Sequence, residues 1–182
     1  MAIRVGINGF GRIGKCVMRV LLGSDDFEPV LINDLASPPQ LAPLLKYDTV
    51  HGNVDYDVTA TETSITADGQ TVSCTSIRNP EDVPWGDTGC DVVLECTGIF
   101  RDRAGASRLI AGGAPKVIIS APAKEPDVTI VMGVNHQDYD PANHQIISNA
   151  SCTTNCLAPV AKVLLENFGI EHGLMTTIHS YT

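Results

Sequence analysis

Long apolar runs, basic charge and closely paired cysteines are all scarce in this 182-residue chain. No apolar run approaches the roughly 20 residues that span a bilayer. Met1 leads directly into a strand pattern, which leaves no room for the apolar core of a secretory signal. Lys and Arg total 12 against 21 Asp and Glu, and the net charge of −9 argues against binding nucleic acid or anionic membranes over a large surface. We therefore expect a soluble, cytoplasmic chain.

The six cysteines form no C-x-x-C pair, and the closest two are Cys152 and Cys156. No histidine or second cysteine pair stands beside them at the spacing of a zinc finger. In a reducing compartment free thiols are the default. We expect neither disulfides nor a metal site.

Strands and helices alternate along most of the chain. The apolar pattern predicts a strand over residues 3–8, a helix ending at Gly23 and a buried strand around residues 30–32, which together form a βαβ unit. The apolar face expected for that helix consists of Ile13, Val17, Val20 and Leu21. Alternation of this kind is typical of a doubly wound α/β sheet.

The later elements follow the same pattern, with one antiparallel excursion around a hairpin turn at Asp68-Gly69. The expected helices cover about residues 38–45, a segment around 109–110, and 152–167. The expected strands cover residues 58–66, 71–75, 92–94, 117–119, 128–132, 146–147 and 174–180. Pro159 is expected to kink or break the last helix, because proline removes one of its hydrogen bonds.

A glycine-rich turn follows the first strand and opens the first helix. The motif Gly9-Phe10-Gly11-Arg12-Ile13-Gly14 is a G-x-G-x-x-G in the context that dinucleotide binding requires. The first glycine permits a tight turn, the second lets a pyrophosphate approach the backbone, and the third lets helix and strand pack closely. The N-terminus of the helix then holds the phosphates.

Asp34 lies twenty residues after Gly14, at the end of the next strand, where a ribose-binding carboxylate is expected. A carboxylate accepts hydrogen bonds from a free ribose 2′-OH and repels a 2′-phosphate. The following Leu35 offers no group that could accommodate that phosphate. These residues favour NAD over NADP.

Cys152 and His179 are the candidate reactive residues. Ser151 is a good N-cap for the helix that begins at Cys152, and a thiol in the first helical turn has its thiolate stabilised by the helix dipole. The spacing of 27 residues between Cys152 and His179 says nothing about their distance in space. The residues alone leave both as candidates, beside the alternative that each is structural.

With these motifs in view, the chain resembles the N-terminal half of the phosphorylating glyceraldehyde-3-phosphate dehydrogenase family over essentially its whole length. The resemblance rests on the turn at residues 7–14 and on four further segments. These are Leu45-Lys46-Tyr47-Asp48, Ser120-Ala121-Pro122, the stretch from Ser148 to Pro159, and His179-Ser180-Tyr181-Thr182. Members of the family carry a proline in the helix of the third segment.

The resemblance implies roles for particular residues. Arg12 and Ile13 would contact the pyrophosphate of NAD and Asp34 the adenosine ribose. Other parts of the cofactor would meet Arg78, Thr97, Gly98 and Ser120. Cys152 would attack the aldehyde of glyceraldehyde 3-phosphate, with His179 as its base. The resulting thioester would be cleaved by inorganic phosphate. Ser151 and Thr153 would help bind phosphate near the thioester, and Thr182 would touch a phosphate at the neighbouring site.

The resemblance also implies an organisation. We expect a Rossmann-type NAD-binding domain over residues 1–150, followed at 151–182 by the first helix and strand of a truncated α+β catalytic domain. The longer enzyme would be a cytoplasmic glycolytic homotetramer, of which this chain alone would be inactive. Two alternatives are erythrose-4-phosphate dehydrogenase, in which the ribose acid is typically Glu, and a non-catalytic NAD-binding module.

Overall fold

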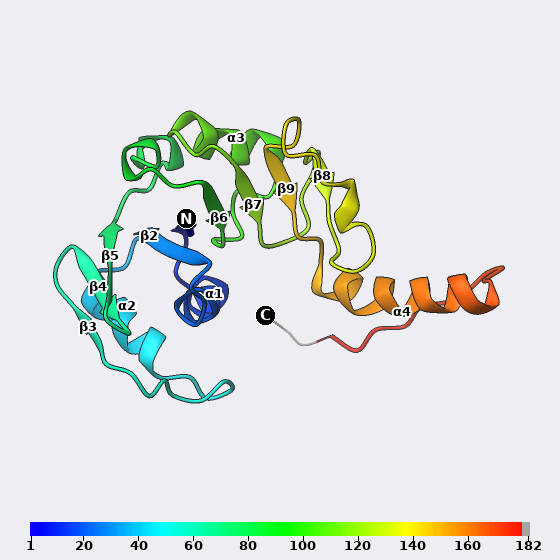
Figure 1. The fold of residues 1–182 in the computed structure, drawn as a ribbon, viewed down its shortest axis with the longest axis horizontal. Coiled ribbons are helices and arrows are strands. Elements are labelled where there is room, and N and C mark those ends of the chain that lie inside the picture. Colours follow the sequence, from blue (N-terminus) through cyan, green and yellow to red (C-terminus); the bar gives the residue numbers. More distant parts are fainter. Residues whose placement is uncertain (180–182) are drawn as a thin grey trace.

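The structure, a computed structural model, describes residues 1–179 and shows one mostly parallel sheet with helices packed on both of its faces (Figure 1). The strands are β1 Ile3–Asn8, β2 Phe27–Asn33, β3 Val58–Ala60, β4 Ser64–Ala67, β5 Gln70–Thr75, β6 Val92–Glu95, β7 Val117–Ile119, β8 Val128–Thr129 and β9 Ile146–Ser148. The helices are α1 Arg12–Leu22, α2 Pro38–Lys46, α3 Arg103–Ala111 and α4 Cys152–Phe168. This architecture confirms the expected doubly wound α/β fold.

The strand order is β3-β4-β5-β2-β1-β6-β7-β9-β8. β1 pairs in parallel with both β2 and β6. The strands β2 to β5 therefore extend the sheet in one direction from β1, and the strands β6 to β9 extend it in the other direction. The carboxyl ends of β1, β2 and β6 meet where these directions diverge, which is where open parallel sheets bind their ligands.

The antiparallel excursion lies at one edge of the sheet, where β3 pairs with β4 and β4 with β5. Asp68 and Gly69 connect β4 to β5 with φ angles of 49° and 75°. Positive φ at both central residues is what a two-residue hairpin turn requires, so the predicted turn is confirmed. β5 then pairs in parallel with β2 and returns the chain to the main sheet.

One hydrophobic core lies on each face of the sheet, and successive residues of β2 contribute to opposite cores. Ile32 packs with residues of α1 and α2 in one core, whereas Leu31 packs with residues of α3 in the other. The predicted face of α1 is wrong in part, because Ile13 and Val20 are exposed. The buried residues of α1 are Gly14, Met18, Leu21 and Leu22, since Gly14 has no side chain and lets the helix lie directly on β1.

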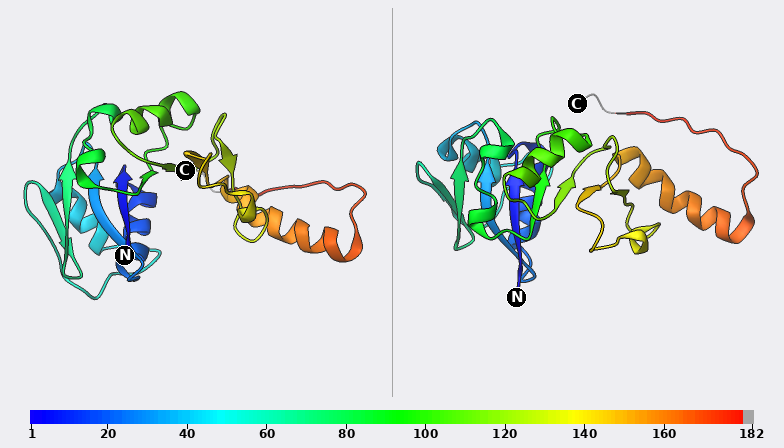
Figure 2. Two further views of the ribbon diagram at one scale, coloured as in Figure 1. Left: turned by 45° about the horizontal axis from the view of Figure 1, so that its top comes forward. Right: turned by 90° about the horizontal axis from the view of Figure 1, so that it is seen from above.

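α4 begins at Cys152 as predicted and extends away from the edge of the sheet (Figure 2). The helix is continuous through Pro159, so the expected break is wrong. Asn155 stabilises the first turns, because its side-chain amide donates to the carbonyl oxygens of Asn149 and Ser151 at 2.9 Å each. Among the helices of residues 1–179, none combines the length and apolar character needed to cross a membrane.

Three predicted strands differ in the structure. The strand expected over 58–66 is divided into β3 and β4, and two others are absent or shorter than expected. Within residues 174–179 there is no strand, and Ser180, the last residue of that prediction, lies outside the described residues. Leu174 and Ile178 are fully exposed, because no described strand offers a backbone partner to this segment. The strand expected over 128–132 contains only Val128 and Thr129, which pair with β9 before the backbone turns away.

Candidate functional site: a dinucleotide crevice and a cysteine–histidine pair

A crevice of about 460 Å³ opens at the carboxyl ends of β1, β2 and β6. Its walls come from these strand ends and from the segments at residues 77–79 and 97–100. The lining consists of Asn8, Gly9, Gly11, Asn33, Asp34, Leu35, Ile77, Arg78, Asn79, Cys96, Thr97, Ile99, Phe100 and Arg108. The position at the point where the strand order reverses makes this crevice the candidate dinucleotide site.

The three glycines of the first turn have different surroundings. Gly9 has a φ of 90°, and a Cβ atom there would lie 2.7 Å from the backbone nitrogen of Thr97. A Cβ on Gly14 would overlap the carbonyl oxygen of Gly9. A Cβ on Gly11 would meet no atom within 4 Å, although Gly11 lines the crevice. Gly9 and Gly14 thus permit close packing, whereas Gly11 leaves an open approach to the backbone, as a bound pyrophosphate requires.

Asp34 lies directly after β2 and lines the crevice. Its Oδ2 accepts a hydrogen bond of 2.7 Å from the backbone N–H of Phe10, and its Oδ1 accepts one of 2.9 Å from Ala36. The carboxylate is therefore fixed against the glycine-rich turn. Each oxygen keeps a second lone pair, so the carboxylate can still accept from a ribose hydroxyl.

The other residues expected at the cofactor divide into two groups. Arg78 and Thr97 line the crevice. Arg12, Ile13, Gly14, Gly98 and Ser120 are not among its lining residues. The guanidinium of Arg12 pairs with the buried carboxylate of Asp48, and the Ser120 hydroxyl donates to the carbonyl oxygen of Glu95 at 2.9 Å. Arg12 and Ile13 begin α1, so their backbone N–H groups lie at the helix N-terminus, where anions are favoured.

Three buried polar residues beneath the crevice were not predicted as part of the site. Asn8, Asn33 and Glu95 end β1, β2 and β6 and are 2%, 5% and 1% exposed. Asn8 is in register with both of the others. Burial raises the pKa of Glu95 above the usual value for a glutamate. The signal in the sequence was a polar residue at the end of each apolar strand, but only the strand order shows that the three are neighbours.

Cys152 and His179 lie together at the start of α4. The Sγ atom of Cys152 is 3.2 Å from Nε2 of His179, because the exposed segment after α4 runs back along the helix (Figure 1). The hydrogen bonds with His179 and Thr153 hold the pKa of the Cys152 thiol below its usual value. The thiol is exposed and has an adjacent imidazole, so the pair has the composition of an activated nucleophile and its base.

Ser151 forms the predicted N-cap, since its hydroxyl accepts a hydrogen bond of 2.9 Å from the backbone N–H of Thr154. Thr153 Oγ1 lies 4.0 Å from the Sγ atom of Cys152. The residues on either side of Cys152 thus carry hydroxyl groups, as the binding of phosphate beside the thiol would require. Thr182, the third residue expected to bind phosphate, lies outside the described residues.

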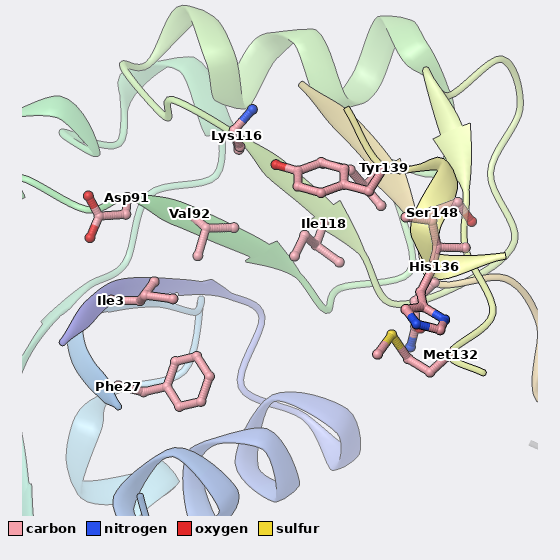
Figure 3. Close-up of a pocket in the computed structure, with 13 residues that line it drawn as sticks. Ile3, Phe27, Asp91, Val92, Lys116, Ile118, Met132, His136, Tyr139 and Ser148 are labelled. Atoms are coloured by element: carbon pink, nitrogen blue, oxygen red, sulfur yellow. The ribbon is translucent and has the colours of Figure 1, made fainter. Parts of the chain in front are cut away.

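A larger cavity of about 630 Å³ lies elsewhere, over the sheet near the amino ends of β1, β2 and β6 (Figure 3). Apolar side chains such as Ile3, Val92 and Ile118 dominate its lining, and no residue predicted for the site is among them. Size alone would therefore point away from the residues predicted for the site. All six cysteines lie within residues 1–179 and none forms a disulfide, and in the same range no three His, Cys, Asp or Glu side chains are grouped as metal ligands.

Comparison with known proteins identifies two family models that match this chain. One, described as glyceraldehyde 3-phosphate dehydrogenase, NAD binding domain, matches residues 3–103. The other, described as glyceraldehyde 3-phosphate dehydrogenase, C-terminal domain, matches residues 151–182. The first description names NAD, the cofactor that the sequence predicts.

Curated relatives agree with the family models. The glyceraldehyde-3-phosphate dehydrogenase of Streptomyces coelicolor is 61% identical over 183 residues, which cover 100% of this chain and 54% of the relative. Glyceraldehyde-3-phosphate dehydrogenase 1 of Bacillus cereus is 55% identical over 179 residues, which cover 98% of this chain and 54% of the relative. The glyceraldehyde-3-phosphate dehydrogenase of Geobacillus stearothermophilus is 55% identical over 182 residues, which cover 100% of this chain and 54% of the relative. The chain spans about half the length of the curated relatives it matches.

Proposed function

Because the chain belongs to the glyceraldehyde 3-phosphate dehydrogenase family, we propose that it carries the cofactor and nucleophile sites of an NAD-dependent phosphorylating dehydrogenase. The reaction is the oxidation of glyceraldehyde 3-phosphate to 1,3-bisphosphoglycerate. The observation that supports the nucleophile most directly is the 3.2 Å contact between Cys152 and His179 at the N-terminus of α4.

The chemistry follows from the thiol and the imidazole. The Cys152 thiolate attacks the aldehyde carbon, and the resulting alkoxide takes a proton from the protonated imidazole of His179 to give a hemithioacetal. His179 takes this proton back as the hydride leaves. NAD, when bound, supplies the acceptor for the hydride that leaves the same carbon. The product on Cys152 is a thioester. Inorganic phosphate then attacks the thioester carbon, so the acyl phosphate leaves and the thiolate of Cys152 is restored.

The residues around the crevice have matching roles in this proposal. The N–H groups of Arg12 and Ile13 face the pyrophosphate, with Gly9, Gly11 and Gly14 shaping the turn. Asp34 binds the adenosine ribose, and the rest of the cofactor contacts Arg78, Thr97, Gly98 and Ser120. Phosphate is held beside the thioester by Ser151 and Thr153, with Thr182 at the neighbouring phosphate.

The same proposal includes the organisation of the longer enzyme. Residues 1–150 would form the NAD-binding domain and residues 151–182 the beginning of the catalytic domain. The assembled enzyme would be a cytoplasmic homotetramer. The chain of 182 residues alone would not turn over substrate, because His179 lies on an exposed segment and α4 has no buried residue.

The test joins this chain to the remaining segment of the Streptomyces coelicolor relative and follows formation of NADH from glyceraldehyde 3-phosphate. We expect NADH formation that requires inorganic phosphate. The variant Cys152→Ser should abolish it, whereas Cys156→Ser, a matched change one helical turn away, should retain it. A higher kcat/KM with erythrose 4-phosphate than with glyceraldehyde 3-phosphate would favour the alternative that the enzyme is an erythrose-4-phosphate dehydrogenase. NAD binding without turnover of either aldehyde would favour a non-catalytic module.

A further inference from the structure

A continuous relay of hydrogen bonds connects the ends of β2, β1 and β6 beneath the crevice. The Asn33 amide donates to Oδ1 of Asn8 at 2.9 Å, and the Asn8 amide donates to Oε2 of Glu95 at 2.6 Å. Glu95 Oε1 accepts from both the backbone N–H and the hydroxyl of Thr97, the N–H at 2.7 Å. All three side chains of the relay are buried, so each of their donors must find its acceptor within the protein.

Backbone N–H groups fix the polarity of this relay at both ends. At one end, the N–H of Ile77 donates to Oδ1 of Asn33 at 2.9 Å, which obliges the Asn33 amide nitrogen to donate toward Asn8. At the other end, the N–H of Thr97 donates to Glu95. Neither N–H can reverse its direction. Donors therefore converge on Glu95 from both sides, and the side chain there must accept on both of its oxygens, as a carboxylate does and an amide does not.

The two ends of the relay are also the two walls of the crevice. Asn33 accepts from the N–H of Ile77 and donates to its carbonyl oxygen at 2.9 Å, which anchors the wall that carries Arg78 and Asn79. On the opposite wall, the Thr97 hydroxyl that donates to Glu95 accepts in turn from the N–H of Ile99 at 3.0 Å. The relay thus connects the two walls of the crevice through hydrogen bonds.

The glycine-rich turn depends on the same residue. A Cβ on Gly9 would lie 2.7 Å from the Thr97 nitrogen, so the two backbones are already in close contact. A displacement of Thr97 therefore displaces the turn that faces the pyrophosphate or opens a gap beside it.

We propose that Glu95 is a positioning residue for NAD, which holds the crevice walls in their binding arrangement through Asn8 and Asn33 and through Thr97. The inference rests on the proposed binding of NAD in this crevice. Glu95 does not line the crevice, so in this proposal it acts through its hydrogen-bonding partners and is not a catalytic residue.

Three variants test this proposal, with the Kd for NAD measured by calorimetry well below the unfolding temperature. Glu95→Gln brings an amide donor against the amide of Asn8 or the N–H of Thr97. It should weaken NAD binding about tenfold or more, the size of effect expected when a buried donor loses its acceptor. In the double variant Asn8→Asp with Glu95→Gln, the carboxylate lies on β1 instead of β6. Every hydrogen-bond donor of the relay then faces an acceptor again. It should bind NAD within about threefold of the unchanged chain, since the number of satisfied donors is restored.

Ser148→Ala is the matched control. Its hydroxyl is buried at the end of β9 and makes hydrogen bonds to Ala121 and Ala150, away from the crevice. It should lower the unfolding temperature and leave the Kd unchanged, which separates positioning from stability.

The outcomes distinguish the proposed binding of NAD in the crevice from the proposed positioning role of Glu95. Absence of NAD binding by the unchanged chain would overturn the proposed cofactor site itself. Normal binding by the unchanged chain and equal binding by Glu95→Gln would overturn the positioning role alone. If Glu95→Gln does not fold, the double variant decides. Failure of that variant to fold, or binding more than about threefold weaker, would contradict the relay, because its donors and acceptors are complementary.

Discussion

The Sγ atom of Cys152 lies 3.2 Å from Nε2 of His179, although 27 residues separate them in the chain. The contact depends on the helix that begins at Cys152 and on the segment that returns along it. It provides the thiol with a hydrogen-bonding partner in a position where the helix dipole also favours the thiolate.

The first prediction concerns thiol reactivity. Because the pKa of Cys152 is lowered, chiefly by the hydrogen bond with His179, iodoacetamide should label Cys152 first near neutral pH. Burial raises the pKa of both Cys74 and Cys96 to about 11, so these two should react last. In His179→Asn, the rise of the alkylation rate with pH should move to higher pH, whereas Cys156→Ser should leave it in place. Peptide mapping that finds another cysteine labelled before Cys152 would contradict the assignment.

The second prediction concerns the choice of cofactor. The Asp34 carboxylate should repel the 2′-phosphate of NADP, so NAD should bind at least about tenfold tighter, or roughly 1.4 kcal/mol. Asp34→Asn removes the charge and keeps an oxygen that can accept from the Phe10 N–H. It should narrow the difference between the two cofactors, mainly by improving NADP binding. Titration of both nucleotides measures this, and equal affinities in the unchanged chain would remove Asp34 from its role.

The third prediction separates two glycines of one turn. Gly14→Ala forces a Cβ into the carbonyl oxygen of Gly9 and should cost about 1–3 kcal/mol of unfolding free energy, as overpacking does. Gly11→Ala meets no atom within 4 Å and should fold with little loss. Its methyl group nevertheless faces the crevice and should weaken NAD binding strongly. Urea unfolding and NAD titration of both variants give the comparison. A stable Gly14→Ala would refute the packing argument.

The fourth prediction concerns pH and the buried carboxylate of Asp48. Hydrogen bonds from the N–H groups of His51 and Val50, followed by the neighbouring Lys15 and Arg12, hold the pKa of Asp48 well below its usual range. A depressed pKa in the folded state stabilises the protein above the unfolded value of about 3.9 and loses this contribution as the pH falls. Asp48→Asn should therefore be less stable than the unchanged chain at pH 7.

The difference between the two proteins should shrink as the pH falls below about 4, where Asp48 becomes protonated on unfolding. Urea unfolding at a series of pH values measures it. A difference that stays constant with pH would show that the charge of Asp48 does not contribute to stability.

The fifth prediction concerns the 182-residue chain by itself. The residues that line the crevice come from one packed sheet, so the chain should bind NAD, although weakly. Hydride transfer needs Cys152 and His179 held in register, and loss of near-attack geometry costs orders of magnitude in rate. Because the segment that carries His179 is exposed, we expect no useful turnover by this chain. Robust reduction of NAD, with longer protein excluded by mass spectrometry, would show that the positioning argument is wrong.

Local pattern was sufficient for much of the fold. The glycine spacing at residues 9–14 and the turn at Asp68-Gly69 are recognisable without the structure, because each depends on backbone conformation over a few residues. Asp34 is recognisable by its place at the end of the next strand. The N-cap at Ser151 and the start of α4 are recognisable for the same reason. The strand expected over 174–180 shows the limit of such patterns, because a strand exists only where another backbone accepts its hydrogen bonds.

The sequence by itself therefore determined the order of most elements, the glycine-rich turn and the position of Asp34 at the end of the second strand. Only the tertiary structure decided which strand ends are neighbours, and so brought Asn8 between Asn33 and Glu95 beneath the crevice. It also decided that α1 turns Gly14 and Met18 inward, rather than Ile13 and Val20. The physical reason is the same in each case: hydrogen bonding and close packing across the sheet join residues whose separation along the chain says nothing about their distance.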